Sequence, residues 1–138
     1  MKPKYYILLL AFVMFHMANA QNQANIWYFG NYCGLDFNSG VPVNTHEIHA
    51  GGSNAMSVMC DSSGDFLFCF DARKIWNREG NFMPNGENFI GDARAAMGAL
   101  IVQQPGSDHL YYVFTVAYNQ AEEIGMHYSV VDMNLDGG

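Results

Sequence analysis

Short apolar and aromatic runs, separated by turn residues, make up most of the chain after residue 25. Almost no stretch keeps a helical period for more than two turns, whereas β-branched and aromatic residues are frequent in the runs. Strands are therefore predicted at residues 26–29, 35–37, 55–60, 66–70, 74–76, 81–83, 98–103, 110–116 and 126–133. This pattern predicts an all-β fold of short antiparallel strands.

Glycine-containing turns predict which strands pair as hairpins. Residues 61–65 join the strands 55–60 and 66–70, and Gly64 supplies the positive φ that such a loop needs. Residues 77–80 place Gly80 in the same role for the next pair, and residues 84–86 are expected to end the following strand. Residues 87–97 have enough alanine for a single helical turn, which the flanking glycines disfavour.

The most aromatic strands recur at a regular spacing. They begin at residues 26, 66 and 110, which gives separations of 40 and 44 residues. A four-stranded propeller blade occupies about 40 to 50 residues. The spacing predicts a partial β-propeller of fewer than three blades, and a small β-sandwich is the alternative.

The N-terminus has the three parts of a signal peptide. Lys2 and Lys4 precede an apolar stretch of 13 residues from 5 to 17, and Ala20 completes the small-residue site before Gln21. The stretch is shorter than the roughly 20 apolar residues that span a membrane. We expect cleavage between Ala20 and Gln21, with residues 1–20 as signal peptide and residues 21–138 as an exported β domain. The mature chain is expected at the cell surface or outside the cell, without a membrane span.

Acidic residues outnumber basic ones. The chain has 13 acidic and 6 basic residues, a net charge of −7. Cleavage would remove Lys2 and Lys4, so residues 21–138 would keep 4 basic residues against 13 acidic ones, or −9. Nucleic acid is not expected as a partner, because its phosphates bind to basic surfaces.

The chain has three cysteines, Cys33, Cys60 and Cys69, so at least one thiol is unpaired. Cys60 and Cys69 flank the turn 61–65 of the first predicted hairpin. Antiparallel pairing would put Cys60 opposite Phe66 or Leu67, which leaves Cys69 too far along the strand for a good disulfide. Buried free thiols are therefore predicted.

Several short motifs, in order along the chain, resemble one protein family. They lie at residues 25–31, 34–40, 66–68, 75–78, 83–86, 91–92, 111–116 and 128–138. Together they resemble the N-terminal propeller-like region of large secreted surface proteins of gliding Bacteroidetes. The resemblance implies that more propeller strands, PKD-type repeats and a gliding-motility-associated C-terminal domain for type IX secretion follow, so that this chain is a truncated fragment. It also implies adhesion as the role and the missing remainder of the polypeptide as a partner.

Residues 132–137 have the D-x-N-x-D-G spacing of a calcium loop, with Asp132, Asn134 and Asp136 as oxygen ligands. The bidentate glutamate of such a loop would fall at residue 143, beyond Gly138. The alternative is a turn after the last strand, which the sequence favours. No other cofactor is predicted.

Motifs for catalysis are missing from the sequence, which contains no Ser-His-Asp order, P-loop or Gly-x-Ser-x-Gly elbow. The sequence favours a non-catalytic extracellular interaction or adhesion module that binds a surface polysaccharide or protein. Trp27, Tyr28, Trp76 and Tyr118 are the candidates for stacking on a ligand, although most aromatic rings of a small β domain belong to its core. The alternative is a carbohydrate-active or other hydrolytic propeller whose carboxylates converge at one end of the strands.

Overall fold

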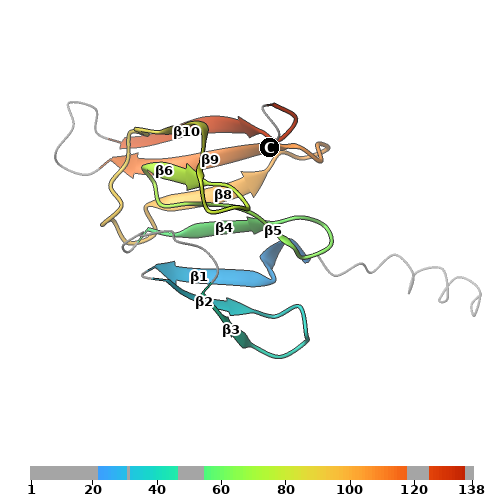
Figure 1. Cartoon of the computed structure of the whole chain (residues 1–138). Helices are drawn as coiled ribbons and strands as arrows, with labels where there is room; N and C mark the ends of the chain where they lie inside the picture. Colours follow the sequence, from blue (N-terminus) through green and yellow to red (C-terminus); the bar gives the residue numbers. More distant parts are fainter. Residues whose placement is uncertain (1–21, 31, 47–54, 118–124, 136–138) are drawn as a thin grey trace, which may run out of the picture.

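A computed structural model describes residues 22–30, 32–46, 55–117 and 125–135, and all structural statements refer to these residues. The elements are one 3₁₀ turn and a succession of strands (Figure 1). In chain order they are η1 (Asn22–Ala24), β1 (Ile26–Gly30), β2 (Cys33–Asp36), β3 (Val43–Thr45), β4 (Ser57–Cys60), β5 (Phe66–Phe70), β6 (Lys74–Trp76), β7 (Phe82–Glu87), β8 (Ala99–Gln103), β9 (Leu110–Ala117) and β10 (Gly125–Asp132).

The strands form three antiparallel sheets in the described part of the chain, each built from consecutive strands. Their orders are β1-β2-β3, β4-β5-β6-β7 and β10-β9-β8, and none is closed into a barrel. The predicted all-β class of short antiparallel strands is thus confirmed. The hairpin turns also form as expected, because Gly64 and Gly80 take φ values of +95° and +76°.

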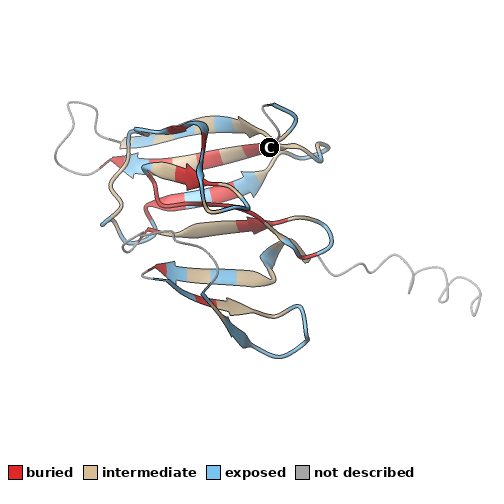
Figure 2. Ribbon diagram, in the orientation of Figure 1, coloured by how far each residue is buried: buried red, intermediate tan, exposed pale blue. Residues whose placement is uncertain are grey.

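The sheet β4–β7 lies in the middle and is covered on both faces. On one face Met59 pairs with Phe68, and the Phe68 ring packs edge-on at 5.4 Å from Tyr111 of the sheet β8–β10. On the other face Cys69 pairs with Trp76, and this buried pair packs against Tyr28 of β1. Figure 2 shows the buried residues concentrated on β4, β5, β6, β8 and β9, whereas β1 and β3 carry more exposed ones.

The first strand of each sheet contacts the first strand of the next sheet, because β1 lies against β4 and β4 against β8. A side-chain hydrogen bond joins β8 to β4, in which the Ile101 N–H donates to Ser57 Oγ at 3.0 Å. Inner strands of successive propeller blades meet in this way around an axis. The arrangement is therefore consistent with a partial propeller, and also with a small sandwich-like stack of sheets.

The three aromatic strands that recur along the sequence do not hold the same position in their sheets. β5 and β9 are each the second strand of their sheets, but β1 is the first. The first strands begin at Ile26, Ser57 and Ala99, with separations of 31 and 42 residues. Aromatic residues occur where a strand packs against its neighbours, whatever the position of that strand in its sheet. The regular spacing of the aromatic strands therefore did not identify equivalent strands of successive sheets.

Two strand predictions are corrected by the structure. β3 was not predicted, since its three residues include the polar Asn44 and a single β-branched residue at each end. Residues 84–86 do not end a strand, because β7 continues through Pro84 to Glu87. β7 is an edge strand, and its register is irregular opposite Lys74 to Trp76, so the missing N–H of Pro84 costs no ladder bond. Residues 88–98 form turns and bends and no helical turn.

The cysteine prediction is confirmed. Cys60 pairs with Phe66 and Cys69 with Val58, and both thiols are buried and free. Cys33 is exposed and free. In the described residues no helix has the length and apolar character needed to cross a membrane.

Candidate ligand-binding groove

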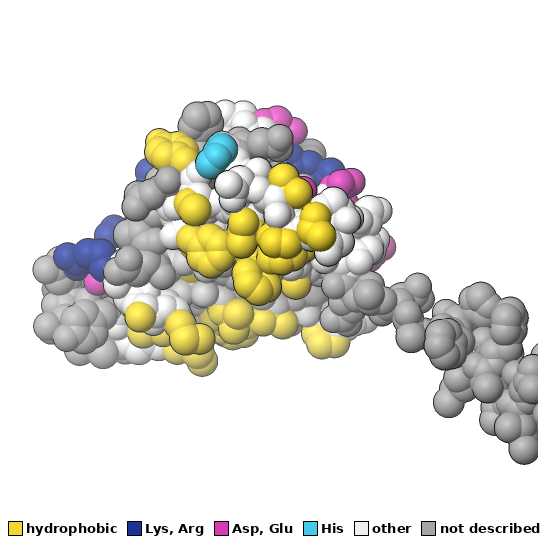
Figure 3. Space-filling view, turned by 90° about the horizontal axis from the view of Figure 1, so that it is seen from below, with side chains coloured by type: hydrophobic (Ala, Val, Ile, Leu, Met, Phe, Trp, Pro, Cys, Tyr) yellow, Lys and Arg dark blue, Asp and Glu magenta, His cyan; other side chains and the backbone are white. Residues whose placement is uncertain are grey.

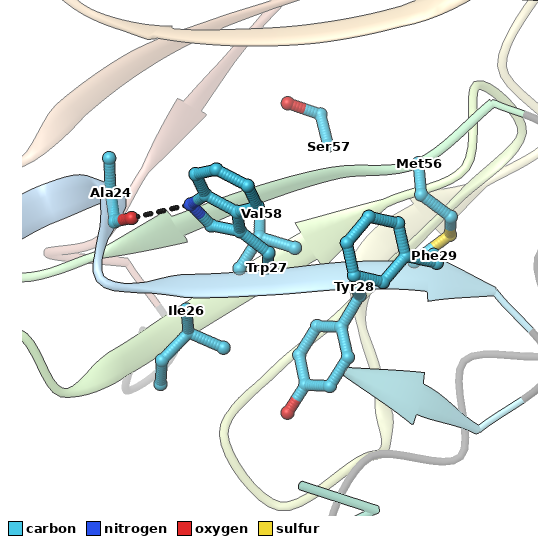
Figure 4. Close-up of a pocket in the computed structure, with 8 residues that line it drawn as sticks. All are labelled: Ala24, Ile26, Trp27, Tyr28, Phe29, Met56, Ser57 and Val58. Atoms are coloured by element: carbon cyan, nitrogen blue, oxygen red, sulfur yellow. Dashed lines mark hydrogen bonds between the residues drawn. The ribbon is translucent and has the colours of Figure 1, made fainter. Parts of the chain in front are cut away.

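A groove runs between β1 and the beginning of β4, where the first two sheets meet (Figure 4). It encloses about 440 Å³ and is open to solvent. The lining side chains are apolar or aromatic apart from one hydroxyl and one phenol, but the accessible surface of the groove is about as polar as it is apolar. The lining residues are Ala24, Ile26, Trp27, Tyr28, Phe29, Met56, Ser57 and Val58. A concave site that combines apolar surface with polar groups can bind a small ligand.

Trp27 is the most distinctive side chain of the groove, since half of it (50%) is exposed. Its Nε1–H donates to the Ala24 carbonyl oxygen at 2.8 Å, as the dashed line in Figure 4 shows. Its ring also packs on Phe37, with 5.0 Å between the ring centroids. The hydrogen bond at Nε1 and the contact with Phe37 thus hold the indole in one orientation. The rest of its ring surface is available to a ligand.

The alternation of β1 sends neighbouring side chains to opposite sides. Trp27 and Phe29 lie on one side of the strand, and Ile26 and Tyr28 lie on the other (Figure 4). Tyr28 packs edge-on against Phe66 at 5.7 Å and is half-buried. Tyr28 therefore anchors β1 to the middle sheet, while Trp27 and Phe29 face outward.

Asparagine side chains fix the position of β1 on the middle sheet. Asn25 donates to Asn38 Oδ1 at 2.9 Å, and the Asn38 amide donates to the Gly64 carbonyl oxygen at 2.9 Å. Asn22 also donates to the Ser62 carbonyl oxygen at 3.2 Å. These bonds tie both ends of the segment that carries Trp27 to the β4–β5 turn, so the groove is built from two sheets held together.

The predicted stacking residues do not all meet in this groove. Trp27 and Tyr28 line it, but Trp76 is only 6% exposed and lies in the core beside Cys69. Tyr118 lies outside the described residues. Sequence reasoning missed Phe29 and Phe37, although the alternation in residues 26–29 already placed Phe29 on the same side as Trp27.

Of the predicted calcium ligands, Asp132 is the last residue of β10 and Asn134 lies in the turn that follows. The Asn134 N–H donates to Asp132 Oδ1 at 3.0 Å, which closes a turn on the Asp132 carboxylate. Asp136 lies outside the described residues, as do Ala20 and Gln21 of the predicted cleavage site. Across the described ranges, no three His, Cys, Asp or Glu side chains gather in a way that could hold a metal ion.

Hydrophobic side chains gather in a band on the side of the molecule seen from below Figure 1, where β1–β3 lie (Figure 3). Exposed apolar residues of this sheet and its turns include Trp27, Phe29, Val41 and Val43. The first sheet and its turns therefore present several apolar side chains to solvent.

In comparisons with known proteins, no family model, curated protein or solved structure matches this chain. The resemblance to surface proteins of gliding bacteria is not tested by them and stays a prediction.

Proposed function

We propose that the chain is a non-catalytic, exported interaction module that binds a neutral surface polysaccharide in the groove beside Trp27. The observation that carries the proposal is the Trp27 indole, half exposed and held by its bond to Ala24. A fixed aromatic ring loses little conformational freedom when a ligand stacks on it. The predicted signal peptide supports export, and the resemblance supports a surface protein of a gliding-type cell as the setting.

The chemistry of the groove suits a sugar ring. The C–H face of a pyranose is apolar and matches an aromatic surface such as Trp27 with Phe29 beside it. Ser57 also lines the groove, with its Oγ accepting the Ile101 N–H of β8. Residues 21–138 have 13 acidic and 4 basic residues, a net charge of −9, which opposes anionic ligands and favours a neutral polysaccharide.

The carboxylates support binding rather than hydrolysis. Asp61, Asp71 and Asp92 each accept hydrogen bonds from backbone N–H groups of their own turns. A hydrolase of the glycosidase type needs two carboxyl groups facing each other across the bound sugar. Of the residues that line the groove, none is Asp or Glu.

Binding of cellohexaose and laminarihexaose to the full chain, measured by titration calorimetry, tests the proposal. We expect at least one of these neutral hexasaccharides to bind, and Trp27→Ala to weaken that affinity about tenfold or more, since a buried aromatic contact contributes above 1 kcal/mol. Ligand binding should also shift the tryptophan fluorescence emission, because the ligand would cover the exposed Trp27 while Trp76 is already buried.

Phe82→Ala is the matched control, since this ring is 44% exposed on β7 and lies outside the groove. Its affinity should equal that of the unchanged chain. Failure of both hexasaccharides to bind at millimolar concentration, or equal binding by Trp27→Ala, would contradict the proposal.

A further inference from the structure

The sheet β8–β10 has an outer face made of apolar side chains. Its strand register places Leu100, Phe114 and Tyr128 side by side in one row. The next row consists of Val102, Tyr112 and Val130, and Val116 and Met126 extend the same face. None of these positions carries a charge.

The opposite face of the same sheet is core. Ile101 and Val113 are 6% and 0% exposed and belong to the main hydrophobic cluster with Phe68. The outer face has similar chemistry but faces solvent, since Met126, Tyr128 and Val130 are 72%, 66% and 53% exposed. An antiparallel sheet with one solvated face normally places polar residues on that face. Here the solvated face is apolar on all three strands, and the polar His127 and Ser129 of β10 lie on the inner side.

Aromatic rings form the centre of the outer face. Tyr112, Phe114 and Tyr128 lie with their ring centroids 6.1 to 6.3 Å apart, and the aliphatic residues surround them. Leu100, Val102, Val116, Met126, Tyr128 and Val130 are 40 to 72% exposed. Their exposed apolar area is therefore on the order of a few hundred Å², the size of the largest apolar patch on a typical monomer. A stable interface buries about 800 Å² per partner, so this face would form the centre of such an interface.

We propose that two copies of this chain pack face to face through the β8–β10 outer face and form a two-fold symmetric dimer. The partner must present an uncharged apolar sheet face, and the chain itself carries one. A two-fold axis places the same surface patch on both sides of the interface. The aromatic rings of one copy would then pack against those of the other, and the aliphatic residues likewise. Asp132 lies at the end of this face, opposite Leu110, and the rows at its centre carry no charge. The negative net charge of the chain therefore opposes contact elsewhere more than at the centre of this face. The proposal is independent of the groove and its ligand.

Sedimentation velocity on the full chain over a range of concentrations tests the dimer. Val130→Glu should weaken dimerisation by more than about tenfold, because each interface would bury two uncompensated carboxylates. Val41→Glu is the matched control, since Val41 has a similar exposure of 60% but lies in a turn away from this face. Far-ultraviolet circular dichroism on both variants checks that the sheets still form.

Oxidation by hydrogen peroxide tests the unchanged chain, with methionine sulfoxide measured by mass spectrometry. Met126 lies on the proposed interface, whereas Met97, which is 91% exposed, lies outside it. Raising the protein concentration should slow oxidation of Met126 several-fold and leave Met97 unchanged.

A chain that stays monomeric at all concentrations would overturn the proposal, and would assign the face to another sheet, as in a longer polypeptide. A dimer that persists in Val130→Glu, or Met126 oxidation that is independent of concentration, would overturn it as well.

Discussion

Gly64 holds the contact between the first two sheets. Its φ of +95° is unfavourable for residues with a Cβ, and a Cβ placed there would lie 2.2 Å from Asn38 Oδ1. The same Asn38 amide bonds the Gly64 carbonyl oxygen and accepts from Asn25. One glycine therefore permits both the turn and the attachment of the segment that carries Trp27.

Gly64→Ala should lower the free energy of unfolding by about 3 kcal/mol, and Gly80→Ala by about 1 kcal/mol. Gly80 also has a positive φ of +76°, but nothing lies within 4 Å of an added Cβ. The difference between the two variants isolates the steric displacement of Asn38 and the loss of its hydrogen bonds. Urea denaturation measures the free energy of unfolding of both variants. Equal losses would show that displacement of the Asn38 side chain does not destabilise the fold.

The two buried thiols also act at the scale of single residues. Burial, with a smaller effect from the Asp71 carboxylate, raises the pKa of Cys69 from 9.0 to about 12. Burial likewise raises the pKa of Cys60. Folding therefore favours the neutral thiols, and both should react slowly with reagents that need a thiolate.

The raised thiol pKa values predict loss of stability in alkali. Their contribution is fully present below the unfolded pKa of about 9 and is lost as the pH rises toward the folded value of about 12. Stability should thus fall above about pH 9 in the unchanged chain and fall less steeply in Cys69→Ala. At about pH 8 a disulfide reagent should label exposed Cys33 quickly and the other two thiols only after denaturation. Rapid labelling of all three in the folded chain would contradict this.

At the scale of elements, the faces of a strand determine what its residues contribute. β5 is buried on both faces and reads Phe-Leu-Phe-Cys-Phe, a continuous apolar run. β9 and β10 each have one buried or half-buried side and a second side that is exposed to a greater degree. The run of apolar residues in β5 indicated a fully buried strand, but the sequence could not indicate which sheets would cover it.

Phe68→Ala should lower the free energy of unfolding by about 3 to 5 kcal/mol, since it removes a fully buried ring between two sheets. Phe114→Ala should lower it by less than about 1.5 kcal/mol, because this ring lies on the outer face of β9. Denaturation at low protein concentration, where a dimer dissociates, makes the comparison. Similar losses for the two variants would mean that the outer face is covered within one copy.

At the scale of the whole molecule, three sheets share two internal interfaces, and the first and third sheets each carry exposed apolar side chains on their outer faces. The middle sheet is covered by Tyr28 on one side and by Tyr111 and Val113 on the other. The groove opens beside the first sheet, and the proposed dimer face belongs to the third. The two proposals therefore concern separate surfaces, and the Trp27 and Val130 variants should each affect only one of them.

The sequence by itself determined the all-β class, most strand positions, the glycine turns and the free thiols, because these depend on local propensity and on neighbours within one hairpin. Tertiary structure decided the rest. β3 and the continuation of β7 depend on pairing that overrides local signals, as at Pro84. Burial of Trp76 and exposure of Trp27 depend on which face another sheet covers, which the residues beside each tryptophan do not indicate. The period of two along a strand separates its faces, but only packing against a distant segment makes one of them core and leaves the other as surface.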